Sequence, residues 1–316
     1  MKYALVFPGQ GAQEVGMGKS LFDMFPIARE IFQRADSSLG FHLSQLIFDG
    51  PEEKLTLTAY TQPAILTVSV AVYEILSQEF GLHFSPAYIA GHSLGEYTAL
   101  VVAGALSLED GVRLVHLRGS LMQEAVPEGE GAMAALLGLE SDIVEDLCKT
   151  IAPHGECQAA NYNSPGQVVI SGATAFVEKA VEEAKERGAR KAVMLKVSAP
   201  FHSKMMRPVA NKLKEAFNGC QWEAPQWPVV ANVSAQPVST VREVQNALFH
   251  QTYMPVLWAK SVEYMASQGV DTYFELGPGT VLAGLIKRCQ KGSKTYSVAT
   301  EEDIKTITSL FKEVVE

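Results

Sequence analysis

The stretch that decides the fold is Tyr88–Ala103, which reads YIAGHSLGEYTALVVA. The short apolar run Tyr88–Ala90 predicts a buried strand, and Glu96–Ala103 carries a helix-forming pattern. Between them stands the G-x-S-x-G sequence Gly91-His92-Ser93-Leu94-Gly95. A strand-to-helix turn this sharp requires small flanking residues, and it lifts the serine hydroxyl clear of the backbone at a helix N-terminus. The segment therefore predicts either a nucleophilic serine or an ordinary tight turn.

The same order of apolar run, glycine and helical pattern recurs near both ends of the chain. Tyr3–Phe7 precedes Gly9-Gln10-Gly11, and Thr272–Leu276 precedes Gly277-Pro278-Gly279. This recurrence is typical of a mostly parallel sheet covered by helices. We therefore expect a large α/β domain.

The middle of the chain has a different order of predicted strands and helices, which indicates a second, smaller domain. Strands and helices are expected there in the order βαββαβ, over Ala132–Leu137, Asp142–Thr150, Gln158–Asn161, Gln167–Ser171, Ala173–Arg187 and Lys191–Val197. That order is the ferredoxin-like pattern. We expect a ferredoxin-like domain over residues 128–198, inserted into a large domain formed by residues 1–127 and 199–316.

Composition excludes several classes of protein. The chain has 316 residues, of which 47% are hydrophobic and 19% charged, as in ordinary globular domains. The net charge of −9 argues against a nucleic-acid or anionic-membrane partner. No apolar run approaches the roughly 20 residues of a spanning helix, so a soluble, cytoplasmic protein is expected. No C-x-x-C pair occurs, which predicts reduced thiols and no metal site for Cys148, Cys157, Cys220 and Cys289.

A serine hydroxyl needs a base within hydrogen-bonding reach before it can act as a nucleophile. Among seven histidines, His202 stands where the smaller domain is expected to return the chain to the larger one. A domain junction forms a natural cleft, so His202 is the candidate base. His92 adjoins Ser93, but neighbouring side chains at such a turn point apart, and a structural role is expected for it.

Arg118 lies on a predicted helix over Ser107–Ala125, where Ser107 and Asp110 have the spacing of an N-terminal capping box. The arginine shares its helix face with Leu114, Val115, Leu121 and Met122. Because a buried guanidinium requires a partner, Arg118 pairs either with a distant Asp or Glu or with the carboxylate of a ligand. Arg113 faces Glu109 and Asp110 instead, as a surface ion pair.

Seven blocks in a fixed order resemble the malonyl-CoA:acyl carrier protein transacylases, from the first strand to about residue 290. The blocks are Phe7–Gln13, Gly91–Tyr97, the Arg118 helix, Asn161–Gln167, Pro200–Ser203, Gln251–Trp258 and Glu275–Gly279. The resemblance implies a hydrolase-like α/β domain with a ferredoxin-like insert, which agrees with the order of elements above. It also implies an acyltransferase that works by ping-pong transfer through an acyl-serine.

The resemblance implies a role for each matching residue. Ser93 is the nucleophile and His202 the general base, while the main-chain carbonyl of Gln251 orients the histidine. Backbone N–H groups of Gln10 and Leu94 form the oxyanion hole, and Arg118 pairs with the malonyl carboxylate.

Three further residues are expected to touch the acyl group. Met122 lies on the face of Arg118, and Asn161 matches a position near the active site. Phe201 matches a phenylalanine that, in polyketide acyltransferases, accompanies malonyl rather than methylmalonyl selection.

The resemblance implies malonyl-CoA and holo acyl carrier protein as partners. No cofactor is expected, because a thioester is already reactive. The enzyme is expected to be a monomer. The carrier is expected to dock transiently on local basic clusters, which are Lys185, Arg187, Arg190, Lys191 and Lys196; Lys204, Arg207, Lys212 and Lys214; and Lys287, Arg288, Lys291 and Lys294. Three alternatives stay open: a serine thioesterase or esterase, a non-catalytic docking module, and a free-standing acyltransferase that serves a polyketide synthase.

Overall fold

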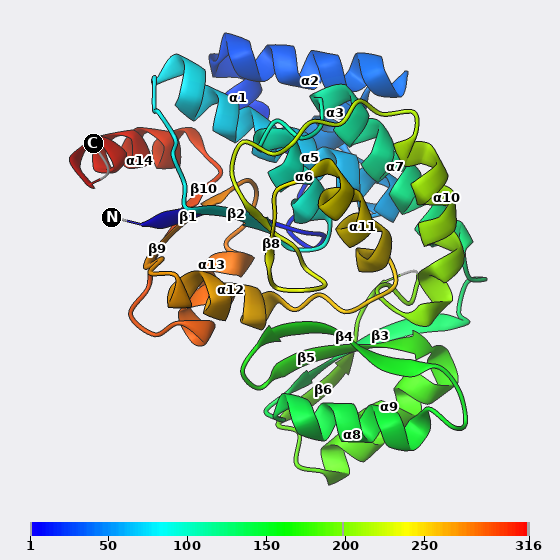
Figure 1. The fold of residues 1–316 in the computed structure, drawn as a ribbon. Helices are drawn as coiled ribbons and strands as arrows, with labels where there is room; N and C mark the ends of the chain where they lie inside the picture. Colours follow the sequence, from blue (N-terminus) through cyan, green and yellow to red (C-terminus); the bar gives the residue numbers. More distant parts are fainter. Residues whose placement is uncertain (1, 198, 315–316) are drawn as a thin grey trace.

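The computed structural model describes residues 2–197 and 199–314 (Figure 1). Its strands are β1 (Tyr3–Phe7), β2 (Tyr88–Gly91), β3 (Gly131–Leu137), β4 (Cys157–Ser164), β5 (Gln167–Ala173), β6 (Lys191–Met194), β7 (Val229–Val230), β8 (Pro237–Val238), β9 (Thr272–Leu276) and β10 (Lys294–Val298). They form a six-stranded sheet in the order β10-β9-β1-β2-β7-β8 and a four-stranded sheet in the order β4-β5-β3-β6.

Helices surround both sheets. They are α1 (Lys19–Met24), α2 (Pro26–Leu39), α3 (Leu43–Asp49), α4 (Glu52–Leu55), α5 (Thr58–Glu74), α6 (Leu94–Val102), α7 (Leu108–Glu124), α8 (Ser141–Ile151), α9 (Thr174–Glu186), α10 (Arg207–Phe217), α11 (Val241–Gln251), α12 (Trp258–Ser267), α13 (Val281–Cys289) and α14 (Glu301–Val314). A π-helical turn, Ile75–Glu79, continues α5, and a 3-10 turn, Lys204–Met206, precedes α10. None of the helices within the described residues is long and apolar enough to cross a membrane.

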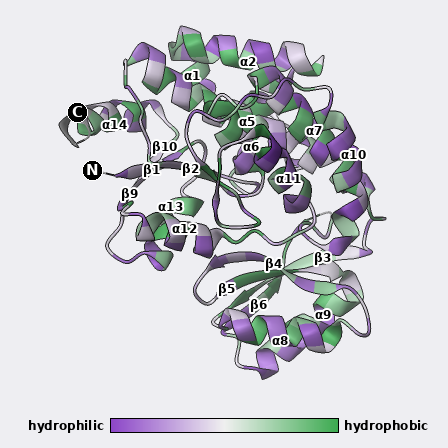
Figure 2. Ribbon diagram, in the orientation of Figure 1, coloured by the Kyte–Doolittle hydropathy of each residue, from purple (hydrophilic) through white to green (hydrophobic). Residues whose placement is uncertain are grey.

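The larger sheet is parallel except at β8, which pairs antiparallel with β7. Helices α5, α6 and α7 cover one face, and α12 and α13 cover the other (Figure 1). Alternate side chains of β1 therefore enter different cores: Leu5 and Phe7 pack with the first group, Ala4 and Val6 with the second. Hydrophobic residues gather on the sheet strands and on the inner sides of the helices (Figure 2). The predicted α/β class with a parallel sheet is confirmed.

The smaller sheet is antiparallel, and its order β4-β5-β3-β6 is that of a ferredoxin-like unit. Helices α8 and α9 pack on its outer face and enclose a separate apolar core (Figure 1). The division of the chain at residues 128 and 198 stays a prediction, and Ser198 lies outside the described residues.

Two elements of the smaller sheet differ from the sequence expectation. β4 continues to Ser164, so the connection to β5 is only Pro165-Gly166. The predicted strand was too short because two register shifts in β4 hide the alternation of its side chains. β6 ends at Met194 rather than Val197. The returning chain places Pro200 against Gly131 at the start of β3, where an extension of β6 would have to pair.

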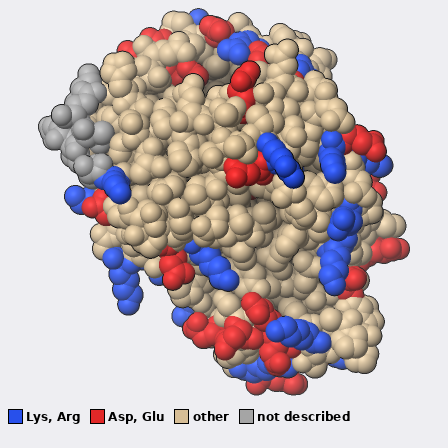
Figure 3. Space-filling model, in the orientation of Figure 1, with Lys and Arg blue, Asp and Glu red and all other residues tan. Residues whose placement is uncertain are grey.

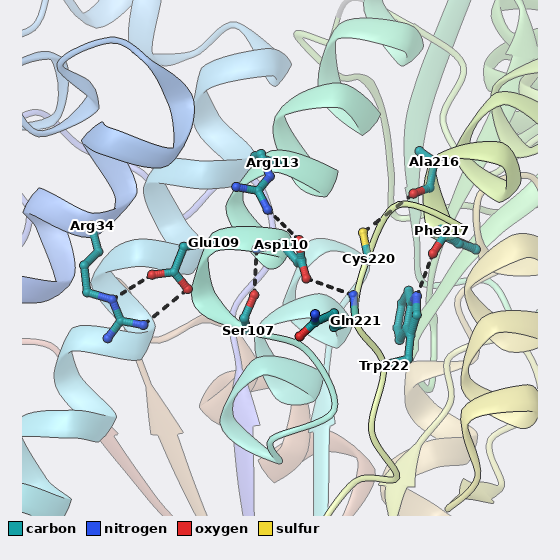
Figure 4. A network of polar contacts seen from close by, with 10 residues as sticks. All are labelled: Arg34, Ser107, Glu109, Asp110, Arg113, Ala216, Phe217, Cys220, Gln221 and Trp222. Carbon is teal, nitrogen blue, oxygen red and sulfur yellow. Dashed lines mark hydrogen bonds and ion pairs between the residues drawn. The ribbon is translucent and has the colours of Figure 1, made fainter.

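Helix α7 is fixed at its N-terminus by a polar network (Figure 4). Ser107 caps the helix by accepting a hydrogen bond from the Asp110 N–H over 3.0 Å. Arg113 donates to Asp110 over 2.6 Å, as expected, whereas Glu109 accepts from Arg34 of α2 instead. The network anchors the helix that carries Arg118.

Candidate active site

Three neighbouring parallel strands of the larger sheet end at one edge. Gln10 follows β1, Ser93 follows β2 and Asn232 follows β7. Ligands of open α/β sheets bind at this carboxyl edge. The smaller sheet closes over it, because the Tyr162 N–H donates to the Val256 carbonyl over 2.9 Å. A cavity of about 200 Å³ lies between them, lined by Gln10, Gln62, His92, Ser93, Arg118, Met122, Met133, Asn161, Asn163, Val169, Leu195, Val197, Phe201 and His202.

Ser93 occupies a strained turn at the start of α6. Its φ of 53° and ψ of −106° lie in a region that non-glycine residues rarely adopt. A Cβ at Gly91 would overlap the Gly95 carbonyl, and a Cβ at Gly95 would overlap the Phe7 carbonyl. Both glycines of the motif are therefore sterically required. This geometry is that of a nucleophile elbow rather than of an ordinary connecting turn.

Asn232 holds both sides of this turn. Its Oδ1 accepts from the Ser93 N–H over 2.7 Å, and its Nδ2 donates to the Gly91 carbonyl over 2.7 Å. The asparagine is fully buried, so these bonds face no competition from water. They stabilise the strained backbone that presents the Ser93 hydroxyl to the cavity.

His202 lies between the serine and a main-chain acceptor. Its Nε2 is 2.8 Å from Ser93 Oγ, and its Nδ1 is 2.7 Å from the Gln251 carbonyl oxygen. Because a carbonyl only accepts, it fixes the tautomer with the proton on Nδ1 and leaves Nε2 free to take the serine proton. Burial, and then the nearby Arg118 cation, lower the pKa of His202 to about 3. The imidazole is therefore neutral at pH 7.

Arg118 is 2% exposed and projects from α7 toward the same serine. Its guanidinium donates to Gln62 Oε1 over 2.7 Å, to Gln251 Oε1 over 2.9 Å and to Ser93 Oγ over 3.1 Å. No ion pair to this arginine is formed by any carboxylate of the described chain. Of the two partners that the sequence left open, the distant Asp or Glu is therefore not found. The Arg118 charge is held by neutral amides at the wall of the cavity.

Gln10 and Leu94 are the residues whose backbone N–H groups are predicted to form the oxyanion hole. Leu94 is the first residue of α6, and Gln10 follows β1, the strand beside β2. Neither backbone N–H makes a hydrogen bond within residues 2–197 and 199–314. Both N–H groups are therefore free to donate, as an oxyanion hole requires, and their assignment to it stays a prediction.

The remaining predicted residues also line the cavity. Met122 is 1% exposed, and its Sδ lies 3.8 Å from Gln62 Nε2. Asn161 projects from β4, and Phe201 precedes the histidine. His92 also lines the cavity, where its Nε2 lies 2.8 Å from Asn163 Oδ1.

Four polar residues of the site were not predicted as site residues, namely Gln62, Glu96, Asn163 and Asn232. Glu96 is 1% exposed; burial raises the pKa of its carboxyl to about 7, although hydrogen bonds from Gln251 and Asn232 oppose the shift. Glu96 directly follows the G-x-S-x-G motif, which was an available signal. Gln62 and Asn232 lie in ordinary surroundings in the sequence and become neighbours of Ser93 only through the fold.

Among the residues that the structure describes, no cluster of His, Cys, Asp and Glu could hold a metal ion. The four cysteines are free thiols.

The residues around Ser93 form a candidate site for a nucleophilic serine, and comparison with known proteins identifies the class of the protein. Residues 4–310 match the acyl transferase domain, so the chain belongs to the acyl transferase family and is an acyltransferase. Two relatives are named malonyl CoA-acyl carrier protein transacylase. That of Bacillus subtilis is 46% identical over 99% of this chain and 98% of its own. That of Escherichia coli K12 is 48% identical over 91% of this chain and 92% of its own.

Solved structures agree with this assignment. An acyl-carrier-protein-S-malonyltransferase from Bartonella henselae superposes with a TM-score of 0.96 at 46% identity, over 99% of this chain and all of its own. A malonyl-transacylase in complex with a type II PKS acyl-carrier protein superposes with a TM-score of 0.95 at 42% identity, over 98% of this chain and all of its own. The predicted family and the predicted two-sheet acyltransferase fold are confirmed.

Proposed function

We propose that this enzyme transfers the malonyl group of malonyl-CoA to the phosphopantetheine thiol of acyl carrier protein and so supplies fatty-acid synthesis. The observation that carries the proposal is Arg118. It is a buried cation that forms no direct ion pair in the described chain, at the wall of a cavity and 3.1 Å from Ser93 Oγ. A bidentate guanidinium suits the free carboxylate of a malonyl group.

In the first half-reaction, Ser93 Oγ attacks the thioester carbonyl while His202 Nε2 accepts the hydroxyl proton. The new C–O bond forms, and the negative charge moves to the carbonyl oxygen, where the Gln10 and Leu94 N–H groups stabilise it. As the intermediate collapses, the C–S bond breaks and the coenzyme A sulfur takes the proton from His202. The product is malonyl-Ser93, with its carboxylate paired to Arg118.

The second half-reaction reverses these steps with a different thiol. His202 Nε2 accepts the proton of the phosphopantetheine thiol, whose sulfur attacks the Ser93 ester. The C–O bond then breaks, and Ser93 Oγ recovers its proton from His202. Met122 and Phe201 form apolar walls of the cavity, and Asn161 adds a polar group. These side chains hold the acyl group and restrict access of water to the ester.

Each step uses only groups of this chain and a reactive thioester, so the proposal needs no metal or other cofactor. Coenzyme A is a substrate or product. The enzyme acts as a cytoplasmic monomer that the carrier protein visits transiently. The large domain, residues 1–127 and 199–316, carries the nucleophile and the base, and the small domain, residues 128–198, covers them.

A second candidate carrier is that of a polyketide synthase, because a similar solved structure is a malonyl-transacylase with a type II PKS acyl-carrier protein. The chemistry at Ser93 is the same in both cases. Initial rates with purified fatty-acid and polyketide carrier proteins, measured at equal concentration, distinguish the two.

The experiment that tests the function follows the acyl group. Incubation with labelled malonyl-CoA is expected to label Ser93, and addition of holo carrier protein to move that label to the carrier thiol. Ser93→Ala should carry no label. Label on a cysteine of the wild type, or release of malonate at the rate of acylation, contradicts the transferase mechanism; the second result indicates a thioesterase.

A further inference from the structure

The strongest unexplained feature of the site is the buried carboxyl group of Glu96. It lies in the first turn of α6, three residues after Ser93, and is 1% exposed. Burying a carboxyl group is unfavourable unless hydrogen bonds satisfy it. The proposed mechanism uses no group at this position, so the fold keeps it for another reason.

The side chain of Gln251 links Glu96 to Arg118 by one hydrogen bond to each residue. Gln251 Nε2 donates to Glu96 Oε2 over 3.1 Å and to the Ser93 carbonyl over 2.7 Å. At its other end, Gln251 Oε1 accepts from Arg118 Nη2 over 2.9 Å. One amide therefore joins the carboxyl group to the guanidinium.

This arrangement permits only one orientation of the Gln251 amide. Rotation by 180° would turn the amide oxygen toward the Ser93 carbonyl, which can only accept, and toward Glu96 Oε2, which already accepts from the Asn232 N–H. The same rotation would turn the NH₂ group toward a cation. Because Glu96 Oε2 and the Ser93 carbonyl accept on one side, Gln251 Oε1 must face Arg118. That contact, together with Gln62, sets the direction of the guanidinium.

We propose that Glu96 is a positioning residue that aims Arg118 at the malonyl carboxylate through the side chain of Gln251. The inference rests on the proposed malonyl transfer. It assigns Gln251 two separate tasks: its main-chain carbonyl orients His202, and its side chain transmits the position of Glu96 to Arg118. Glu96 thereby contributes to the choice of acyl group without touching the reacting atoms.

Hydrogen-bond acceptance rather than charge carries this role. Gln251 Nε2 and the Asn232 N–H both donate to the same oxygen of Glu96, Oε2. The amide oxygen of a glutamine can accept both. Glu96→Gln should therefore preserve the relay, whereas Glu96→Ala removes the acceptor and lets the Gln251 amide turn.

The experiment measures kcat/KM for malonyl-CoA and for acetyl-CoA in the wild type, Glu96→Ala and Glu96→Gln. The ratio of the two constants is independent of the fraction of enzyme that is folded. In Glu96→Ala the malonyl-to-acetyl ratio should fall about tenfold or more, the effect of losing a hydrogen bond to a charged group. In Glu96→Gln the ratio should return to within about threefold of the wild type.

Thr98→Val provides the matched control, because Thr98 is a fully buried residue of the same helix whose hydroxyl has no partner among the described residues. Its ratio should equal that of the wild type. An unchanged ratio in Glu96→Ala, or equal losses in Glu96→Ala and Glu96→Gln, overturns the inference. A wild type that transfers no malonyl group overturns the proposed function itself, so the two failures are distinguishable.

Discussion

Arg118 Nη2 of helix α7 donates a hydrogen bond over 3.1 Å to Oγ of Ser93, the residue that precedes helix α6. The same guanidinium forms part of the cavity wall. A single cation thus lies within reach of both the nucleophile and the space that an acyl group must enter. In the proposed mechanism, this position connects the selection of the acyl group with the chemistry of the serine.

Replacing Arg118 tests its role in selection. Arg118→Ala should lower kcat/KM for malonyl-CoA about 100-fold or more, because the malonyl carboxylate loses a buried charge partner. Transfer from acetyl-CoA should fall less or rise. Arg118→Lys should also transfer malonyl poorly, since an ammonium group cannot reproduce the guanidinium fork. Steady-state kinetics with both thioesters measures these effects.

Arg113→Ala is the matched control on the same helix. Arg113 is half exposed and pairs with Asp110, and such surface pairs contribute about 0–1 kcal/mol. Both substrates should react with this variant at near wild-type rates. Equal losses of malonyl and acetyl transfer in Arg118→Ala would show that Arg118 is structural.

His202 should titrate far below neutral pH. Its pKa is lowered to about 3, first by burial and then by Arg118, so the imidazole stays unprotonated from pH 5 to 8. The rate of Ser93 acylation should therefore show no step from His202 in this range. An unfolded histidine has a pKa of about 6.5. Unfolded chains consequently bind more protons below that value, and the free energy of unfolding should decrease as pH falls from 6.5 toward 3.

The contribution of Arg118 to this shift can be isolated. Arg118→Ala removes the nearby cation, so the pKa of His202 should rise toward its ordinary value while burial still holds it down. Histidine NMR titration of the folded protein measures the value directly, with His202→Ala to assign the signal. A pKa near 6.5 in the wild type contradicts the expected shift. His202→Ala itself should slow both half-reactions by roughly 10²–10⁴-fold.

The turn at Ser93 should be intolerant of one added methyl group. In Gly95→Ala the new Cβ would overlap the Phe7 carbonyl of β1, which is backbone and cannot move aside. We expect a loss of about 1–3 kcal/mol in the free energy of unfolding and strongly reduced acylation of Ser93. Gly284→Ala is the matched control, because Gly284 is also helical and nothing lies within 4 Å of its added Cβ. That variant should be as stable as the wild type or more stable.

Much of this site could be predicted from local sequence because it follows from spacing. The G-x-S-x-G motif between a strand and a helix placed Ser93, and the apolar stripe of α7 placed Arg118. Asn232 and Gln62 could not be predicted, since they reach the site from β7 and α5, and only the order of the strands brings them beside Ser93. The predicted length of β4 was wrong because register shifts in this strand interrupt the alternation of side chains on which strand prediction relies.

We propose that docking of the carrier protein depends on local rather than net charge, because the chain carries −9 and the carrier is expected to be acidic. Lys and Arg side chains are interspersed with Asp and Glu over the small domain (Figure 3). Within the first basic cluster, Arg187 is already paired with Asp146 over 2.6 Å. Lys196 is exposed between Leu195 and Val197, which both line the cavity. Arg190 is exposed just before β6 and has no ion pair among the described residues.

Arg190→Glu combined with Lys196→Glu should therefore lower kcat/KM for transfer to the carrier about tenfold at low salt and weaken its salt dependence. Acylation of Ser93 by malonyl-CoA should change less. The control is Lys149→Glu with Lys179→Glu, which alters net charge equally but on α8 and α9, at the outer face of the small domain. Initial rates of malonyl transfer to the carrier, measured at several salt concentrations, compare the two double variants. Equal rates in both would place docking on another surface, of which the cluster at the end of α13 is the next to test.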